Sequence, residues 1–213
     1  MRKFLQTLKN NKGLILFVIV YAFSRTAVAD WSKVPTGSME PTIYPGDYLL
    51  IDKTAYGASI PFVNVKLWDA DTPERGDIIT FIPPHESRLF VKRVIGIPGD
   101  RIVIEGERIY INDVQVQHDD VIADSSGVIL SESFDVVSHS IKYSQGRPVS
   151  SRKINLVVPE EKYFVMGDHR NNSADSRYWG FVDEENVMGK VNRLVLSFAS
   201  ERGFFESLGK SIQ

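Results

Sequence analysis

A serine that could act as a nucleophile lies in the stretch Pro35–Thr42 (PTGSMEPT), where glycine and proline bracket Ser38. Proline and glycine keep this stretch out of regular helices and central strands, so we expect an irregular turn that holds Ser38 exposed. The chain contains no cysteine, which excludes disulfides, thiolate metal sites and cysteine nucleophiles. The alternative for this stretch is an ordinary turn rich in Ser, Gly and Pro.

Two adjacent cations interrupt the apolar run Phe90–Asp100 (FVKRVIGIPGD). Strand alternation places Lys92 and Arg93 on opposite faces, each among apolar neighbours. Arginine keeps its proton, whereas a desolvated lysine can present a neutral amine near neutral pH. Lys92 is therefore a candidate general base. The alternative is that both cations extend from an edge strand into solvent.

The stretch Gly167–Arg177 (GDHRNNSADSR) consists of small and polar residues and follows an apolar run directly. A solvated loop would explain this composition. A buried loop that holds a neighbouring site in shape would also explain it, because Asp, Arg, Asn and Ser tolerate burial when they are paired.

Two rival functions use the same residues. One is a Ser-His-Asp hydrolase in which Ser38 works with His85, His118, His139 or His169. Asp168 precedes His169 directly, and a carboxylate so placed is poorly positioned to orient that ring. The other is an anchored β domain that binds peptides without catalysis. No spacing resembles His-Glu-x-x-His, so we expect no metal and no cofactor.

The elements that must position these residues are mostly strands. Short runs rich in Val, Ile, Phe and Tyr, bounded by turn residues, predict strands at Tyr48–Ile51, Ile78–Ile82, Leu89–Ile97, Ile102–Ile104, Arg108–Ile111, Ile154–Val158, Tyr163–Met166 and Val187–Phe198. Asp100–Ile104 and Arg108–Asn112 flank Glu105-Gly106-Glu107 and predict a hairpin, so we expect antiparallel neighbours. Residues 117–152 show weaker periodicity and more Ser, Asp and His, which indicates a peripheral excursion.

The N-terminal segment differs in charge from the rest. Residues 1–29 hold five basic and no acidic side chains, leaving 20 basic against 27 acidic residues, or −7, in the remainder. That acidic remainder argues against nucleic-acid binding. Four of the cations precede the apolar run Leu14–Phe23, which predicts a cytoplasmic N-terminus. A helix over Gly13–Ala29 would span roughly 25 Å at about 1.5 Å per residue.

Two fates of this segment stay open. It is either a membrane anchor, with Arg25 and Trp31 at the outer interface, or a signal peptide cleaved after Ala27-Val28-Ala29. As an anchor it divides the chain into a cytoplasmic N-terminus (1–12), a transmembrane segment (13–30) and an extracytoplasmic domain (31–213) that includes the excursion.

Four blocks in this order resemble bacterial type I signal peptidase, a membrane-bound serine protease. They are Gly37–Ile51 (GSMEPTIYPGDYLLI), Arg75–Phe81 (RGDIITF), Phe90–Ile102 (FVKRVIGIPGDRI) and Gly167–Gly180 (GDHRNNSADSRYWG). The resemblance covers about residues 13–112 and 160–198 and leaves 117–152 unmatched. It implies a mostly-β fold class, in which a single transmembrane helix precedes an antiparallel β-sheet catalytic domain with a smaller peripheral β excursion.

The resemblance also implies roles for particular residues. Ser38 corresponds to the nucleophile and Lys92 to its general base. Thr36 falls where the family has a hydroxyl that completes the oxyanion hole with the Ser38 N–H. Ser173 would orient the lysine amine. The supporting residues would be Gly167, Asp168 and the ion pair of Asp175 with Arg177.

The implied substrates are exported preproteins, cut after Ala-x-Ala-like sites. The implied location is the bacterial inner (plasma) membrane, in contact with lipid, with the catalytic domain outside. The oligomeric state is left open.

Overall fold

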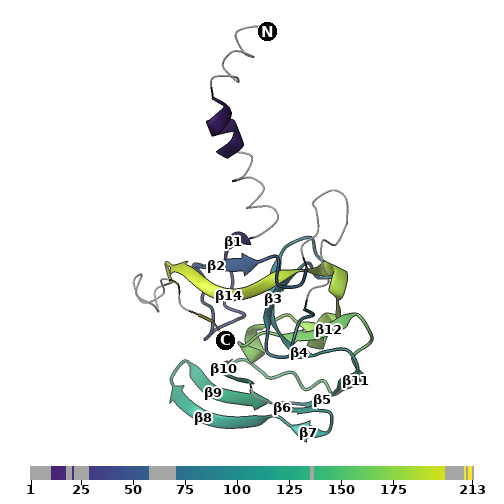
Figure 1. Ribbon diagram of the computed structural model, residues 1–213. Coiled ribbons are helices and arrows are strands. Elements are labelled where there is room, and N and C mark those ends of the chain that lie inside the picture. Colours follow the sequence, from purple (N-terminus) through teal and green to yellow (C-terminus); the bar gives the residue numbers. More distant parts are fainter. Residues whose placement is uncertain are drawn as a thin grey trace.

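The computed structural model describes residues 11–17, 21, 29–57, 71–134, 137–199, 209 and 211–212. Within these ranges the protein is mostly β, as the sequence predicts, and its strands form antiparallel pairs in three sheets (Figure 1). All eight predicted strands are present, with ends that differ from the prediction by at most one residue.

The largest sheet carries the candidate site. It has seven strands in the order β1-β2-β14-β3-β4-β12-β13. Their bounds are β1 (Ala29–Lys33), β2 (Asp47–Asp52), β3 (Ile78–Phe81), β4 (Phe90–Gly96), β12 (Lys162–Met166), β13 (Val182–Asp183) and β14 (Val187–Ser197). The four residues of β3 (IITF) are all buried, which explains why β3 lacks the alternation of apolar and polar residues. Its one polar side chain, Thr80, donates to Gly189 O at 3.2 Å.

A second sheet has four strands in the order β11-β5-β6-β7. They are β5 (Arg101–Glu105), β6 (Arg108–Ile111), β7 (Val114–Gln115) and β11 (Ile154–Val157). Glu105 pairs with Arg108 across the turn, which confirms the predicted hairpin. The strands alternate, with Ile102, Ile104 and Ile109 buried in one apolar cluster.

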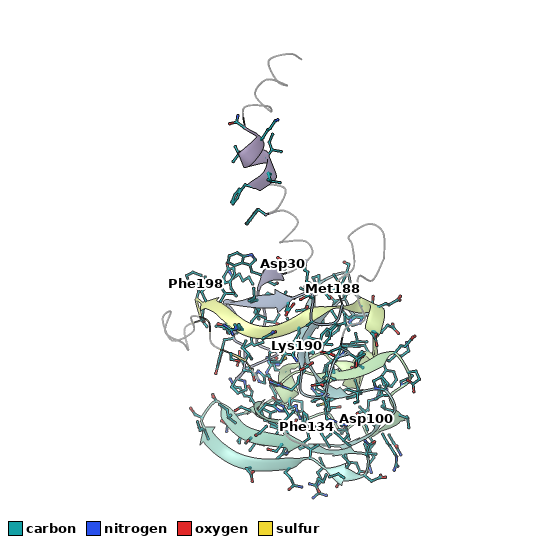
Figure 2. All side chains as sticks on the ribbon, in the orientation of Figure 1. Asp30, Asp100, Phe134, Met188, Lys190 and Phe198 are labelled. Carbon is teal, nitrogen blue, oxygen red and sulfur yellow. The ribbon has the colours of Figure 1, made fainter. Side chains whose placement is uncertain are left out.

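The third sheet lies within the segment predicted to be peripheral. It consists of β8 (Gln117–Asp124), β9 (Gly127–Phe134) and β10 (Val137–Ser144), in the order β10-β9-β8. Phe134, labelled in Figure 2, joins the apolar cluster of the second sheet. Other inward positions of β9 and β10 hold Glu132 and His139, both buried. Because these buried side chains are polar, the hydrophobicity pattern does not show that inward and outward residues alternate.

The N-terminal segment is only partly described. Residues 12–17 are helical, and β1 begins at Ala29, which pairs with Asp52. Ala29 and Asp30, which the sequence places at the end of the apolar segment, are part of β1. Among the described residues no helix is long and apolar enough to span a membrane. Residues 18–20 and 22–28 lie outside the described ranges.

Candidate active site

Ser38 lies on the turn between β1 and β2, as its sequence context predicts. The turn is closed by backbone hydrogen bonds from Glu40 N to Gly37 O (3.2 Å) and from Ile43 N to Met39 O (2.9 Å). The side chains of Met39 and Ile43 are buried in the core beneath it. Burial of these two side chains fixes the turn, while Ser38 remains half-buried at its surface.

Lys92 reaches Ser38 from β4. Its Nζ lies 2.7 Å from Ser38 Oγ and donates a second hydrogen bond to Val91 O at 2.9 Å. Only 4% of Lys92 is exposed, and its Nζ lies 5.4 Å from the centre of the Phe90 ring. The alternative that Lys92 extends into solvent is wrong.

The environment of Lys92 favours the neutral amine. Burial lowers the pKa of Lys92 from 10.5 to about 8, although the charges of Asp175 and Asp168 act in the opposite direction. Desolvation outweighs the carboxylates because their charge is shared with arginine partners. About a tenth of Lys92 is therefore neutral at pH 7, compared with far less than 1% of a lysine with the ordinary pKa.

Arg93 points away from Lys92 and is also buried. Its Nε and Nη2 donate to the two carboxylate oxygens of Asp168 at 2.9 and 2.8 Å. Thr42 Oγ1 donates to the same carboxylate at 2.5 Å. Burial alone would raise the pKa of Asp168, but the charge and hydrogen bonds of Arg93 hold it below its usual value. This pair connects β4 to the stretch Gly167–Arg177.

The stretch Gly167–Arg177 is a buried, paired loop rather than a solvated one. Arg177 donates from Nε and Nη2 to the Asp175 carboxylate, both at 2.8 Å, and Gly167 N donates to it at 3.0 Å. Burial would raise the pKa of Asp175, but Arg177 lowers it below the ordinary value. The loop includes the short helices η1 (Arg170–Asn172) and α3 (Ser176–Trp179), and Asp175 caps the second.

Two further residues of this loop, Gly167 and Ser173, lie close to the turn Pro35–Thr42 that carries Ser38, called the nucleophile turn below. A Cβ added at Gly167 would overlap Ser173 Oγ and the carbonyl oxygen of Ser38, so only glycine permits this contact. Ser173 Oγ is buried, and among the described residues no partner lies at hydrogen-bond geometry. Its hydroxyl is near enough to Asp175 to help lower the pKa of that carboxyl.

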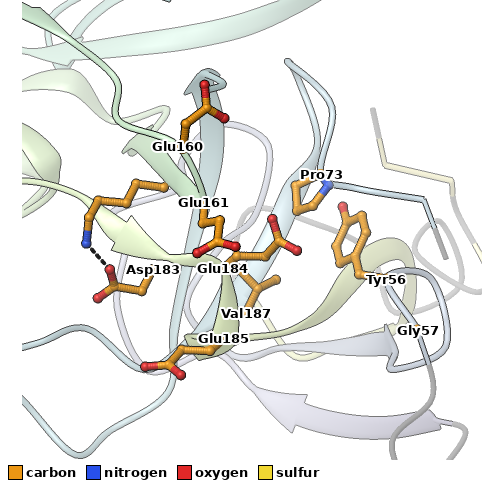
Figure 3. Close-up of a pocket in the computed structure, with 10 residues that line it drawn as sticks. Tyr56, Gly57, Pro73, Glu160, Glu161, Asp183, Glu184, Glu185 and Val187 are labelled. Atoms are coloured by element: carbon orange, nitrogen blue, oxygen red, sulfur yellow. Dashed lines mark hydrogen bonds and ion pairs between the residues drawn. The ribbon is translucent and has the colours of Figure 1, made fainter. Parts of the chain in front are cut away.

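A groove of about 410 Å³ opens beside Ser38 and Lys92. It is lined by residues 32–39, 86 and 88–92, and by Asn172 and Ala174 of the stretch Gly167–Arg177. Thr36 is exposed on its wall. A larger pocket of about 680 Å³, lined by five carboxylates and Lys162, lies elsewhere and contains none of the predicted site residues (Figure 3).

All four histidines are engaged away from Ser38 Oγ. The ring nitrogens of His169 lie 3.0 Å from Gly37 O and 2.8 Å from Ser144 Oγ. His118 and His139 both face Glu132, and His85 packs against the Trp179 ring. Asp168 pairs with Arg93, not with a histidine that contacts Ser38, so the described residues do not form a Ser-His-Asp triad.

Several contacts of the site have no signal in the sequence. Thr42 with Asp168, Glu40 with Lys142, and Glu132 with Arg170 join residues far apart along the chain. The two partners of each contact lie in different stretches of the sequence, so only an alignment of covarying positions would have indicated the pairing.

The family described as signal peptidase, peptidase S26, matches residues 8–196. The chain belongs to this family. The resemblance found in the four sequence blocks is confirmed, and the protein is a hydrolase, a serine endopeptidase of the signal peptidase I type. A non-enzymatic binding module is therefore excluded.

Two relatives agree in sequence with this membership. Signal peptidase I of Pseudomonas fluorescens is 32% identical over 86% of this chain and 70% of its own length. Signal peptidase I of Rickettsia massiliae is 35% identical, over 87% and 79% respectively. A crystal structure of a signal peptidase I from Enterococcus faecalis V583 is 29% identical, covers 56% of this chain and 97% of its own, and superposes with a TM-score of 0.37.

Proposed function

We propose that this enzyme removes signal peptides from exported preproteins, with Ser38 as nucleophile and Lys92 as general base. The observation that carries the proposal is the 2.7 Å contact between Lys92 Nζ and Ser38 Oγ, made by a buried lysine whose pKa is lowered to about 8. A hydroxyl needs a nearby base to attack a peptide carbonyl, and a neutral amine supplies one without histidine.

The chemistry follows from this pair. Neutral Lys92 takes the proton of Ser38 as Oγ attacks the scissile carbonyl. The ammonium then returns that proton to the leaving amine, which departs as the mature protein and leaves an acyl-enzyme. Lys92 next deprotonates a water that attacks the ester, and its proton passes to Ser38 as the signal peptide is released.

Charge develops on the carbonyl oxygen during both attacks. We assign the Ser38 backbone N–H and the Thr36 hydroxyl as donors to that oxygen. Thr36 lies on the groove wall two residues before Ser38, which supports this assignment. One such donor typically contributes about 2.7–4 kcal/mol to catalysis, so loss of the Thr36 hydroxyl weakens the enzyme without abolishing its activity.

The groove beside the pair suits an extended peptide. It runs between residues 32–39 and 86–92, and an extended segment there would pair with backbone groups while its side chains enter shallow pockets. Small residues before the cut, as in Ala-x-Ala, are the expected occupants.

The N-terminal segment is assigned as a membrane anchor with the catalytic domain outside, in the bacterial inner membrane. Four cations before the apolar run support this orientation. Eight residues separate Ala29 from Ser38, and an extended chain spans at most about 3.6 Å per residue. Ser38 therefore lies near the membrane surface, where the cleavage site of a membrane-held preprotein emerges.

The test is processing of a preprotein with an Ala-x-Ala site by the purified protein in detergent. Wild type should release the mature product with its N-terminus directly after that site, and Ser38→Ala should release none while it unfolds at the wild-type temperature. Processing by Ser38→Ala at the wild-type rate would overturn the assignment of the nucleophile.

A further inference from the structure

Lys142 on β10 contacts both parts of the candidate site. Its Nζ lies 2.7 Å from Glu40 Oε2, on the turn that carries Ser38. Its backbone N–H donates to Asp168 O at 2.8 Å, on the loop that supports Lys92. One residue of the third sheet therefore joins the nucleophile turn to the loop Gly167–Arg177, called the supporting loop below.

Glu40 brings this contact close to the nucleophile. Its carboxylate folds back over Gly37, because a Cβ added at Gly37 would overlap Glu40 Oε1. The side chain thus lies against the residue before Ser38. An ion pair that holds this carboxylate also restrains the backbone from which the Ser38 side chain projects.

The supporting loop holds the same turn from another direction. His169 N donates to Ser38 O at 3.1 Å, and His169 Nδ1 lies 3.0 Å from Gly37 O and 3.6 Å from Glu40 Oε2. Lys142 and His169 also form an isolated bridge between their backbones. The side chain of Lys142 therefore acts on a turn that already contacts the loop.

The third sheet is itself fixed to the loop by a buried ion pair. Arg170 Nη1 donates to Glu132 Oε2 at 2.6 Å, and Arg170 Nη2 contacts Glu132 Oε1. Arg177 Nη2 donates to Arg170 O at 2.6 Å. β10 is the strand of this sheet that lies toward the seven-stranded sheet (Figure 1).

We propose that Lys142 is a positioning residue for the reaction: through Glu40 it sets the placement of Ser38 Oγ relative to Lys92 Nζ. This proposal rests on the proposed function of Ser38 and Lys92. It assigns a role to the segment 117–152, which extends the catalytic machinery into the third sheet. The pair is mostly buried, with 18% of the Lys142 side chain and 17% of the Glu40 side chain exposed, so its effect on stability must be measured separately from its effect on the rate.

The test compares Lys142→Met, Glu40→Gln and the double variant in the preprotein assay. Small displacements of a reacting group cost up to about 100-fold in rate. Because the backbone contacts remain, we expect about a tenfold lower kcat in each single variant, with KM within twofold of wild type. The double variant should lose no more than either single variant, since both remove one interaction. Lys142→Arg, which keeps the charge, should restore most of kcat.

A matched control and a fold check make the outcome decisive. Lys153 pairs with Glu105 on the second sheet and is 80% exposed, so Lys153→Met should keep the wild-type kcat. Thermal unfolding shows whether each variant is folded. If Lys142→Met is unfolded, the rate of Glu40→Gln tests the proposal in its place. Wild-type kcat in Glu40→Gln, or multiplying losses in the double variant, would overturn the positioning role. Activity of Ser38→Ala in the same assay would instead overturn the proposed function.

Discussion

The amine of Lys92 lies 2.7 Å from the hydroxyl of Ser38, although the two residues are 54 positions apart in the chain. The contact depends on two separate features of the fold. Buried Met39 and Ile43 fix the turn that carries Ser38, and β3 and β12 flank the strand that carries Lys92. The chemistry that we propose therefore rests on tertiary structure and not on a local motif.

Replacement of Lys92 tests its role as a base. We expect Lys92→Ala and Lys92→Arg to lower kcat by about 10²–10⁴-fold, the usual contribution of general acid–base catalysis. Arginine fails despite its size because it stays protonated. Preprotein processing measures the rate, and circular dichroism checks the fold. Appreciable cleavage by Lys92→Arg would be incompatible with a lysine base.

Ser173→Ala separates a role in catalysis from a role in stability. The Ser173 hydroxyl is buried and interacts with the Asp175 carboxylate, which Arg177 and Gly167 N also bind, so its removal should lower the free energy of unfolding by about 1 kcal/mol or less. If the hydroxyl orients the Lys92 amine during the reaction, kcat falls tenfold or more, equivalent to about 1.4 kcal/mol. Chemical denaturation and single-turnover kinetics measure the two effects. An unchanged kcat in Ser173→Ala would show that the Ser173 hydroxyl has no role in catalysis.

Gly167→Ala should separate the supporting loop from the nucleophile turn. The added Cβ would overlap Ser173 Oγ and Ser38 O, and overpacking of this kind typically costs about 1–3 kcal/mol of stability. We expect a lower unfolding free energy together with a large loss of activity. Gly13→Ala, where a Cβ meets no neighbour, is the control. Wild-type activity in Gly167→Ala would show that the close contact is not needed.

Asp168→Asn tests the buried pair with Arg93. The variant leaves the Arg93 guanidinium buried without its counter-charge, which typically destabilises a protein by about 3–5 kcal/mol. Asp113→Asn removes an exposed partner of Arg101 and should change stability by about 0.5 kcal/mol or less. Denaturant titrations compare the two. Equal losses of stability in Asp168→Asn and Asp113→Asn would mean that the buried ion pair of Arg93 stabilises the fold no more than the exposed ion pair of Arg101.

The sequence predicts the strands that are apolar and fails where buried positions are charged. β3, β4 and β12 consist largely of aliphatic and aromatic residues, and in β4 these outnumber the two buried cations, so composition and flanking turn residues are enough to place them. The strands β8 to β10 bury Glu132 and His139, so their inward faces look polar. A pattern of hydrophobicity cannot reveal a face that is buried through ion pairs.

The same limit applies to the candidate site. Ser38 and Lys92 could be selected because glycine, proline and an apolar strand surround chemically reactive side chains. The link from Glu40 to Lys142 spans 102 residues, and neither residue is unusual in its local sequence. Such pairs are fixed only when the sheets pack together.

Lys92 should also make stability depend on pH. Its folded pKa is about 8 and its ordinary value is 10.5, so the unfolded chain binds more protons between these values. The cost of burying the amine is therefore largest below pH 8 and disappears as pH rises to about 10.5. Relative to Lys92→Met, wild type should gain stability across that interval in denaturant titrations. A constant difference between the two proteins would contradict a depressed lysine pKa.

The pH dependence of kcat tests the central claim most directly, because only neutral Lys92 can accept the proton of Ser38. The measurement is single-turnover processing of a preprotein from pH 6 to pH 10, with chemistry as the slow step. We expect the rate to rise about tenfold per pH unit below pH 8 and to reach a plateau above that value, in line with the lowered pKa of Lys92. A rate that is flat over the whole range would contradict a lysine base and with it the account of this site.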